Sequence, residues 1–236
     1  MIALLSANWD EISQLKKDIK ITEEGGNSEL HYKIGDLYSC SIIITVTGVG
    51  IKRARSATSY IIQKFKPTLI VFGGFGGALS ADLKVGDIVL GESVASLKKN
   101  ETISLYSDFS LPEIEFKKGS LLTESRFINE PDQKKRLLDS TGALVVDMET
   151  WGVVEAARQS GTPVASVRAV SDEADERLPD MAAIYSESGE LDVMKAELYF
   201  KENPELLAPY LKFRLNSTPK ASDSLCQFLH HLVKNL

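Results

Sequence analysis

Residues 41–74 alternate between two kinds of pattern, and this alternation restricts the fold more than any other feature of the chain. The β-branched run SIIITVTGVG (41–50) is typical of a buried strand that ends in a glycine turn. The next segment, IKRARSATSYIIQKF (51–65), repeats its apolar residues with helical spacing and stops before Pro67. A second run, TLIVFGG (68–74), is again apolar on both faces. A strand, a helix and a strand in this order predict parallel strands covered by helices.

The same alternation continues along the chain. Further strands are expected at 2–7, 87–97, 119–125, 143–146 and 163–171, and further helices at about 130–138 and 151–160. Residues 29–34 and 37–40 alternate as a hairpin would, with Gly35 and Asp36 in its turn. The whole pattern predicts an α/β fold, in which a mixed, largely parallel central sheet is flanked by helices on both faces.

After residue 180 the chain becomes helical in character. Helical segments broken at Pro204 and Pro209 precede the amphipathic sequence SDSLCQFLHHLVKNL, for which Ser222 is the expected N-cap. Its apolar residues fall on one face of a helix: Leu225, Phe228, Leu229, Leu232, Val233 and Leu236. We expect this helix to dock on the domain, and a membrane-facing helix is the alternative.

Length and composition limit the remaining possibilities. The 236 residues carry a net charge of −6, so a general affinity for nucleic acid is not expected. We expect a single domain over 1–236, with a core at about 1–180 and a helical C-terminal extension at about 190–236. Cys40 and Cys226 fit no metal-ligand spacing, which favours free thiols in a reducing cytosol. Because no signal-peptide pattern and no apolar run long enough to span a bilayer are found, we predict a cytoplasmic protein.

Acids follow two of the expected strands, at the edge where α/β sheets bind ligands. Asp147 and Glu149 separate a strand from a helix, although buried acids are costly unless they are paired. Ser171 and Asp172 come directly after the last strand. There the acid could donate a proton or accept a hydrogen bond, and the alternative is a helix N-cap.

The glycine cluster GGFGGALSADLKVGDIVL (73–90) permits two interpretations. Glycines after a buried strand allow a positive φ angle and a close approach of the backbone to a ligand. The alternative is a tight turn with close packing. The cluster is neither a dinucleotide fingerprint nor a P-loop, because residues that those motifs require are missing.

Taken together, these motifs resemble a known family. The stretches VTGVG, KPTLIVFGGFGGALSADLKVGDIVL, GSLLTESRFI and VVDMETWGVVEAARQSGTPVASVRAVSDEADE resemble the nucleoside phosphorylase superfamily. Their order and spacing are similar to those of its methylthioadenosine/S-adenosylhomocysteine nucleosidase branch, over about residues 1–180. The tail, with DERLPD and the proline-broken helices, looks more like the hopanoid-associated phosphorylase branch, which is linked to removing adenine from an adenosylated hopanoid.

The resemblance implies roles for three acids. Glu11 would help to activate the attacking water, Glu149 would bind a ribose hydroxyl, and Asp172 would donate a proton to purine N7. Breaking an N-glycosidic bond builds positive charge on the ribose and negative charge on the leaving base. A general acid contributes about 10²–10⁴-fold to such a rate. Asp172 must then hold a proton near neutral pH and Glu149 must stay ionised. No metal or organic cofactor is needed, and we interpret Asp147 as structural.

Further positions match the family's substrate site. Met148 would lie against the sugar, Phe127 would stack on the base, and Ile128 would offer backbone hydrogen bonds. Ser171 belongs to the Ser-Asp pair, and Arg168 matches an arginine near the sugar and the water.

Three positions depart from the family pattern. Gly74 stands where the nucleosidases usually have a serine that touches the ligand, and Phe75 is larger than the usual alanine. Asn8 stands where a methionine normally lines the pocket for the 5′ substituent. The resemblance therefore leaves the 5′ group of the nucleoside open.

We predict an N-ribosyl hydrolase that releases adenine from a 5′-modified purine nucleoside and forms a homodimer or a larger homo-oligomer, as family members commonly do. The first loop, SANWDEIS, contains two acids and no arginine, which disfavours phosphate as the nucleophile. Lys52, Arg53 and Arg55 could bind an anion at a helix N-terminus or form a solvated helix face, so phosphorolysis by glycosyl transfer stays an alternative. Adenine release from an adenosyl-hopanoid also stays open, and membrane contact would come only with such a lipid substrate. A non-catalytic nucleoside-binding paralogue is the remaining possibility.

Overall fold

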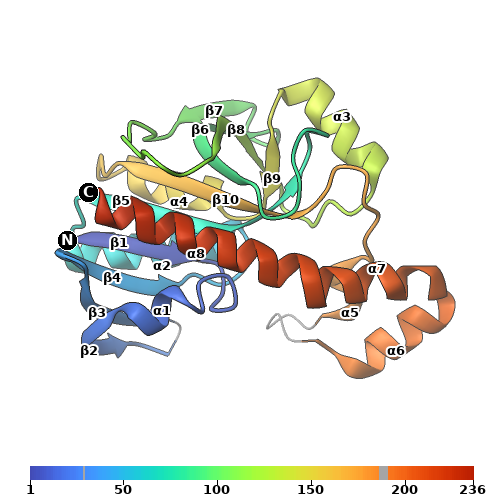
Figure 1. The fold of residues 1–236 in the computed structure, drawn as a ribbon, viewed down its shortest axis with the longest axis horizontal. Coiled ribbons are helices and arrows are strands. Elements are labelled where there is room, and N and C mark those ends of the chain that lie inside the picture. The colour runs from blue at the N-terminus through green and yellow to red at the C-terminus, as the bar shows by residue number, and fades with distance from the viewer. Residues whose placement is uncertain (29, 186–190) are drawn as a thin grey trace.

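The structure, a computed structural model, describes residues 1–28, 30–185 and 191–236. These residues form one mixed sheet with the strand order β10-β6-β8-β9-β5-β1-β4-β3-β2, and β7 pairs with β6 (Figure 1). The strands are β1 (Ile2–Ser6), β2 (Lys20–Gly26), β3 (His31–Leu37), β4 (Cys40–Val46), β5 (Leu69–Ala78), β6 (Ile88–Ser96), β7 (Glu101–Ser104), β8 (Lys117–Thr123), β9 (Val145–Asp147) and β10 (Val164–Asp172). Parallel pairs such as β1–β5 and β5–β10 mix with antiparallel pairs such as β5–β9.

Strand β5 lies at the centre of the sheet. One of its edges pairs first with β1 and then with β9, while the other edge pairs with β10. Because β10 also pairs with β6, β6 with β8 and β8 with β9, these strands and β5 close into a ring. The closure depends on pairings between segments far apart in the chain, which strand patterns alone do not specify.

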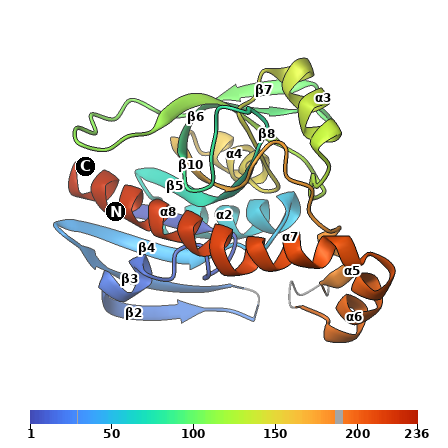
Figure 2. The ribbon, with the colours of Figure 1, turned by 45° about the vertical axis from the view of Figure 1, so that its right-hand side comes forward.

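Helices cover both faces of the sheet, as the sequence predicts. They are α1 (Leu15–Asp18), α2 (Ile51–Phe65), α3 (Pro131–Thr141), α4 (Thr150–Arg158), α5 (Met181–Ile184), α6 (Val193–Glu202), α7 (Leu207–Lys212) and α8 (Thr218–Lys234). Helices α2 and α4 build one hydrophobic core with the sheet, and α8 builds a second core on the opposite face. In Figures 1 and 2 the long helix α8 crosses the sheet, while α5, α6 and α7 form a lobe at one end.

The local predictions are confirmed for α2 and wrong for the hairpin. Helix α2 has the predicted limits, whereas Gly35 and Asp36 lie inside β3 and the turn falls at Tyr38 and Ser39. Gly35 is needed inside the strand, since a Cβ there would lie 2.4 Å from the carbonyl oxygen of Lys20 in β2. Residue 29, the first of the predicted hairpin, lies outside the described residues.

Residues 73–78 of the glycine cluster belong to strand β5 instead of following it, whereas Gly86 lies before β6 and has a positive φ angle of 90°. None of the glycines between residues 73 and 77 has a positive φ angle, so their conformational freedom is not what the fold uses. A Cβ at Gly76 would lie 2.3 Å from a methyl carbon of Val145, and one at Gly73 would lie 3.1 Å from a methyl carbon of Leu229. The missing side chains therefore let β9 and α8 pack directly on β5.

The amphipathic C-terminal helix docks on the domain. Its apolar stripe is buried at Leu225, Phe228, Leu229, Leu232 and Val233. Leu236 follows the end of α8 and is 49% exposed, so the stripe ends before it. Within the described ranges, no helix has the length and hydropathy that a bilayer crossing requires.

Two predictions about helix ends in this region are wrong. Helix α8 begins at Thr218, so Ser222 lies inside the helix instead of capping it. The buried hydroxyl of Ser222 donates hydrogen bonds to the carbonyl oxygens of Asp10 and Glu11, at 2.9 and 3.1 Å. Pro209 does not break a helix, because it lies in the first turn of α7, where proline is tolerated.

Candidate active site

Three predicted site residues come together along one stretch of β5. The backbone N–H of Phe75 donates a hydrogen bond to Glu11, while Arg168 and Asp172 of β10 pair in register with Gly74 and Gly77. The first loop, the middle of β5 and the end of β10 therefore meet at one place in the fold.

Glu11 lies in the loop after β1, and its carboxylate is buried beneath that loop. Its Oε2 accepts hydrogen bonds from the hydroxyl of Ser6 at 2.5 Å and from the N–H groups of Ala7 and Asn8 at 2.9 and 3.1 Å. Its Oε1 accepts one hydrogen bond, from Phe75 N–H at 3.0 Å. Because each carboxylate oxygen offers about two acceptor positions, Oε1 keeps one for a further donor such as water.

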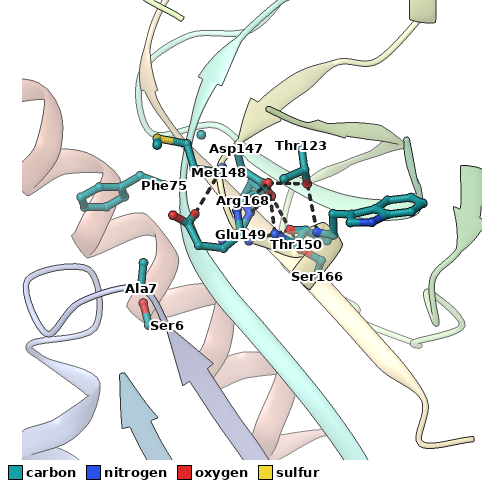
Figure 3. Close-up of polar contacts among 12 residues, drawn as sticks. Ser6, Ala7, Phe75, Thr123, Asp147, Met148, Glu149, Thr150, Ser166 and Arg168 are labelled. Carbon is teal, nitrogen blue, oxygen red and sulfur yellow. Dashed lines mark hydrogen bonds and ion pairs between the residues drawn. The ribbon is translucent and has the colours of Figure 1, made fainter. Parts of the chain in front are cut away.

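Asp147 organises the turn that carries Glu149. Its Oδ1 accepts hydrogen bonds from the hydroxyl of Thr123 at 2.7 Å and from the N–H groups of Glu149 and Thr150, both at 3.2 Å. Its Oδ2 accepts from the Nε of Arg168 at 2.8 Å and from the hydroxyl of Thr150. Figure 3 shows Thr123, Thr150 and Arg168 gathered around this carboxylate. A buried acid is tolerated here because these five donors, among them the Arg168 guanidinium, are aimed at its two oxygens.

Glu149 occupies a different electrostatic environment. Its Oε1 accepts a hydrogen bond at 2.8 Å from the N–H of Gly50, where helix α2 begins, and its Oε2 accepts one at 3.3 Å from Met148 N–H. Burial is the main cause that raises the pKa of Glu149 to about 8, followed by the charge of Asp147, while Arg168 opposes the shift. This raised pKa favours the protonated carboxyl group near neutral pH in the ligand-free protein, whereas the predicted role of Glu149 needs the ionised form.

Arg168 is 1% exposed and is held from several sides. Besides Asp147, its guanidinium donates at 2.6 Å to the hydroxyl of Thr150 and lies 4.3 Å from the centre of the Phe72 ring. A Cβ at position 74 would lie 2.3 Å from Arg168 Nη1. Glycine at position 74 thus makes room for this guanidinium, which gives the departure from the family's serine a physical reason.

Asp172 is fully buried and has an ion-pair partner that the sequence analysis missed. Its Oδ2 accepts a hydrogen bond from the Nζ of Lys134 in α3 at 2.5 Å, and its Oδ1 accepts one from the hydroxyl of Ser171 at 2.7 Å. Lys134 is also fully buried and donates a second bond to the carbonyl oxygen of Glu173 at 2.6 Å. Both oxygens of the Asp172 carboxyl group thus face donors in this structure, and its role as the proton donor stays a prediction.

A sequence signal for Lys134 does exist. Residues three and four positions apart share one face of a helix, so Lys134 lies on the same face as Leu137 and Leu138. Both leucines pack against the core beneath α3, whereas the neighbouring Lys135 and Arg136 are exposed. A lysine on the core-facing side of a short helix indicates a buried acid as its partner.

Of the remaining predicted residues, Asn8 and Met148 enter these contacts through their backbone N–H groups. Ile128 packs its side chain into a small core beneath α3, and Phe127 and Met148 are half-buried. Asn8 is exposed, and its side-chain oxygen accepts a hydrogen bond from Asp10 N–H at 3.1 Å. Contacts with a sugar or a base stay predictions for all four. In the described part of the chain, no three His, Cys, Asp or Glu side chains are grouped as metal ligands would be.

Comparisons with known proteins point to one family. A model described as the phosphorylase superfamily matches residues 1–110 and 99–198. The 5′-methylthioadenosine/S-adenosylhomocysteine nucleosidase of Staphylococcus aureus (strain bovine RF122 / ET3-1) is 26% identical over 196 residues, which cover 73% of this chain and 86% of that protein.

Solved structures share the fold along the whole chain. The Neisseria meningitidis enzyme with the same name, in complex with methylthio-immucillin-A, has a TM-score of 0.77 at 20% identity and covers 100% of this chain and 99% of its own. Futalosine hydrolase of Helicobacter pylori strain 26695 has a TM-score of 0.74 at 19% identity, with coverages of 100% and 97%. The α/β fold predicted from the sequence is confirmed by these likenesses.

Proposed function

The chain belongs to the phosphorylase superfamily, and on this premise we propose that it cleaves the N-glycosidic bond of a purine nucleoside with water and releases the free base. The observation that carries the proposal is that Glu11, Glu149 and Asp172 all belong to segments next to β5 and have different hydrogen-bond partners. Glycosidic bond cleavage needs one group that accepts a proton, one that donates a proton and one that favours a cationic sugar.

Each acid suits one of these tasks. Glu11 keeps an acceptor position at Oε1 for the attacking water. Asp172 sits at the end of β10, where it would hydrogen-bond purine N7 and pass a proton to it as the bond breaks. Glu149, at the start of both α2 and α4, would accept a hydrogen bond from a ribose hydroxyl. Once ionised, it would stabilise the positive charge that develops on the sugar.

Water is favoured over phosphate as the nucleophile because the hydrogen-bond donors of the first loop already have an acceptor. The donors that could hold an anion there, the Ser6 hydroxyl and the N–H groups of Ala7 and Asn8, are already used by Glu11. The N–H of Gly50 at the start of α2 is likewise used by Glu149. A phosphate would have to displace both carboxyl groups from these donors.

The names of the relatives support a more specific choice of base and sugar for the substrate. The S. aureus and N. meningitidis proteins are named for adenosine derivatives that carry sulfur groups at the 5′ position, which supports an adenine nucleoside with a modified 5′ carbon. Phosphorolysis, an adenosyl-hopanoid substrate and a non-catalytic binding role remain the competing functions. Assembly into a homo-oligomer and a cytoplasmic location stay predictions.

A product assay tests the proposal. The protein is incubated with a panel of 5′-modified adenosines, with and without inorganic phosphate, and free adenine, free sugar and sugar 1-phosphate are quantified. We expect adenine and free sugar at a rate that phosphate does not change. Asp172→Asn should lose about 10²-fold or more of the rate, whereas the control Asp175→Asn, at an exposed position three residues later, should keep it. Sugar 1-phosphate as the main product, or full activity of Asp172→Asn, would refute this mechanism.

A further inference from the structure

Lys134 is a fully buried cation that the mechanism above leaves without a role. It lies in helix α3, which precedes β9 and the Met148–Glu149 turn in the chain. Its ammonium group donates to Asp172 Oδ2 at 2.5 Å and to the carbonyl oxygen of Glu173 at 2.6 Å. A lysine is almost never fully buried unless it is paired. The burial of Lys134 therefore depends on its ion pair with the Asp172 carboxylate.

The hydrogen bonds around Asp172 specify where the proton lies. A protonated carboxyl group would need an acceptor for its hydrogen, but Lys134 and Ser171 both direct donors at the two carboxylate oxygens. Asp172 is therefore the acceptor of the pair and Lys134 the donor. The hydrogen that lies between the two groups is thus carried by the Lys134 ammonium.

We propose that Lys134 holds the proton that Asp172 delivers to the leaving base. This inference rests on the proposed hydrolysis. As the C1′–N9 bond breaks, its electron pair moves onto the purine, Asp172 gives a proton to N7, and the Lys134 ammonium gives one to Asp172. Water adds its oxygen to C1′ and its proton to Glu11. Glu11 then releases that proton to solvent, and the neutral Lys134 amine takes one from solvent, so the cycle closes with every proton accounted for.

The other charged groups around the pair are already matched to partners of their own. Glu173, which follows Asp172, pairs with Lys84 at 2.7 Å. Glu176 in the same loop pairs with Lys212, and Glu130 at the start of α3 pairs with Arg177 at 3.0 Å. These side chains are part-exposed, whereas Lys134 and Asp172 are both at 0% exposure. The buried Lys134–Asp172 pair can therefore hold a proton away from solvent until the base leaves.

A purely structural role is the competing explanation, in which Lys134 only neutralises Asp172. The two explanations differ in how the rate depends on pH and on the leaving group. Without Lys134, Asp172 would have to take its proton from solvent, which becomes harder as the pH rises. A leaving group that needs no proton, such as 4-nitrophenolate, would escape this requirement. A structural role would instead affect every substrate at every pH.

The experiment compares Lys134→Met with the wild-type enzyme and with the control Lys135→Met, which alters the exposed neighbour on the same helix. Lys134→Gln is included because it keeps a hydrogen-bond donor toward Asp172 but cannot give up a proton. For each variant, kcat for adenine release is measured from about pH 5.5 to pH 9.5 on the adenosine derivative that the wild type turns over best. Release of 4-nitrophenolate from 4-nitrophenyl riboside is measured in parallel, and thermal melts verify folding.

We expect both Lys134 variants to lose about 10²-fold or more of kcat for adenine release at alkaline pH. The deficit should shrink toward pH 5.5, and nitrophenolate release should stay near the wild-type rate. Wild-type adenine release from either variant across the pH range, or an equal loss for both leaving groups at every pH, would overturn the inference. Failure of the wild type to release a base from any nucleoside would instead overturn the proposed function, so the two failures are distinguishable.

Discussion

Replacing Glu149 by Gln should stabilise the protein relative to the wild type increasingly as the pH rises. The carboxyl group of Glu149 is 6% exposed, and its pKa is raised from an ordinary 4.5 to about 8, first by burial and then by the charge of Asp147. The folded state therefore binds this proton more tightly than the unfolded state does. By linkage, stability is present at low pH and is lost as the pH rises through the window between 4.5 and about 8.

The size of the effect follows from the two pKa values. At pH 6 the folded protein must keep a proton that the unfolded chain has released, which costs roughly 2 kcal/mol of folding free energy. At pH 9 the group is ionised in both states and the full shift counts, so the cost is roughly 5 kcal/mol. A glutamine cannot ionise, and it keeps an oxygen for the N–H of Gly50. Its advantage should therefore grow by roughly 3 kcal/mol between pH 6 and pH 9.

Urea unfolding at pH 6, 7.5 and 9 measures this change directly. The comparison is between pH values, so any constant cost of the substitution, such as the weaker contact with Met148 N–H, cancels. Glu155→Gln is the matched control, because Glu155 lies on the same helix with a side chain that is 23% exposed to solvent. If the stability difference between Glu149→Gln and the wild type is the same at pH 6 and pH 9, then burial does not control this carboxyl group and the reasoning is refuted.

Three further substitutions probe the contacts that hold the site. Asp147→Asn should cost about 3–5 kcal/mol in urea unfolding, because it leaves the buried Arg168 without its counter-charge; a loss under about 1 kcal/mol would mean that the pair is not essential. Gly74→Ala should cost about 1–3 kcal/mol, since its Cβ would lie 2.3 Å from Arg168 Nη1, and an unchanged melting temperature would contradict this. Ser222→Ala should cost about 1–2 kcal/mol through the lost hydrogen bond to the Glu11 carbonyl, and a neutral result would show that water replaces the hydroxyl.

The elements that the sequence predicts well are those with local signals. Helix α2 has a clear apolar periodicity, begins after a glycine turn and ends just before Pro67. Both of its ends are therefore predicted by residues next to them in the sequence. The hairpin turn is predicted at the wrong place because Gly35 looks like a turn glycine. In the structure its missing side chain serves the close approach of β2, a contact between segments that the local pattern does not connect.

The same distinction applies to the candidate site. The sequence alone contains the motif around Met148 and Glu149 and the Ser171-Asp172 pair. The family resemblance implies their roles. Their ionisation is set by partners from other elements. Asp147 takes its hydrogen bonds from β8, α4 and β10, and the partner of Asp172 comes from α3. Such partners follow from the tertiary fold, so the sequence indicates which acids matter without specifying which of them are charged.

The four buried acids of the site differ in whether a cation neutralises them. Arg168 offsets Asp147 and Lys134 offsets Asp172, so these two buried pairs are nearly neutral overall and exert little net field on the sugar. Glu11 is held by donors from the first loop and β5, and the pKa of Glu149, raised to about 8, lets its charge change near neutral pH. In the proposed reaction, a cationic sugar between these two would favour the ionised form of Glu149 by the same electrostatic attraction with which Glu149 would stabilise the sugar. The burial that makes this carboxylate costly in the free protein therefore makes its charge more effective when positive charge develops beside it.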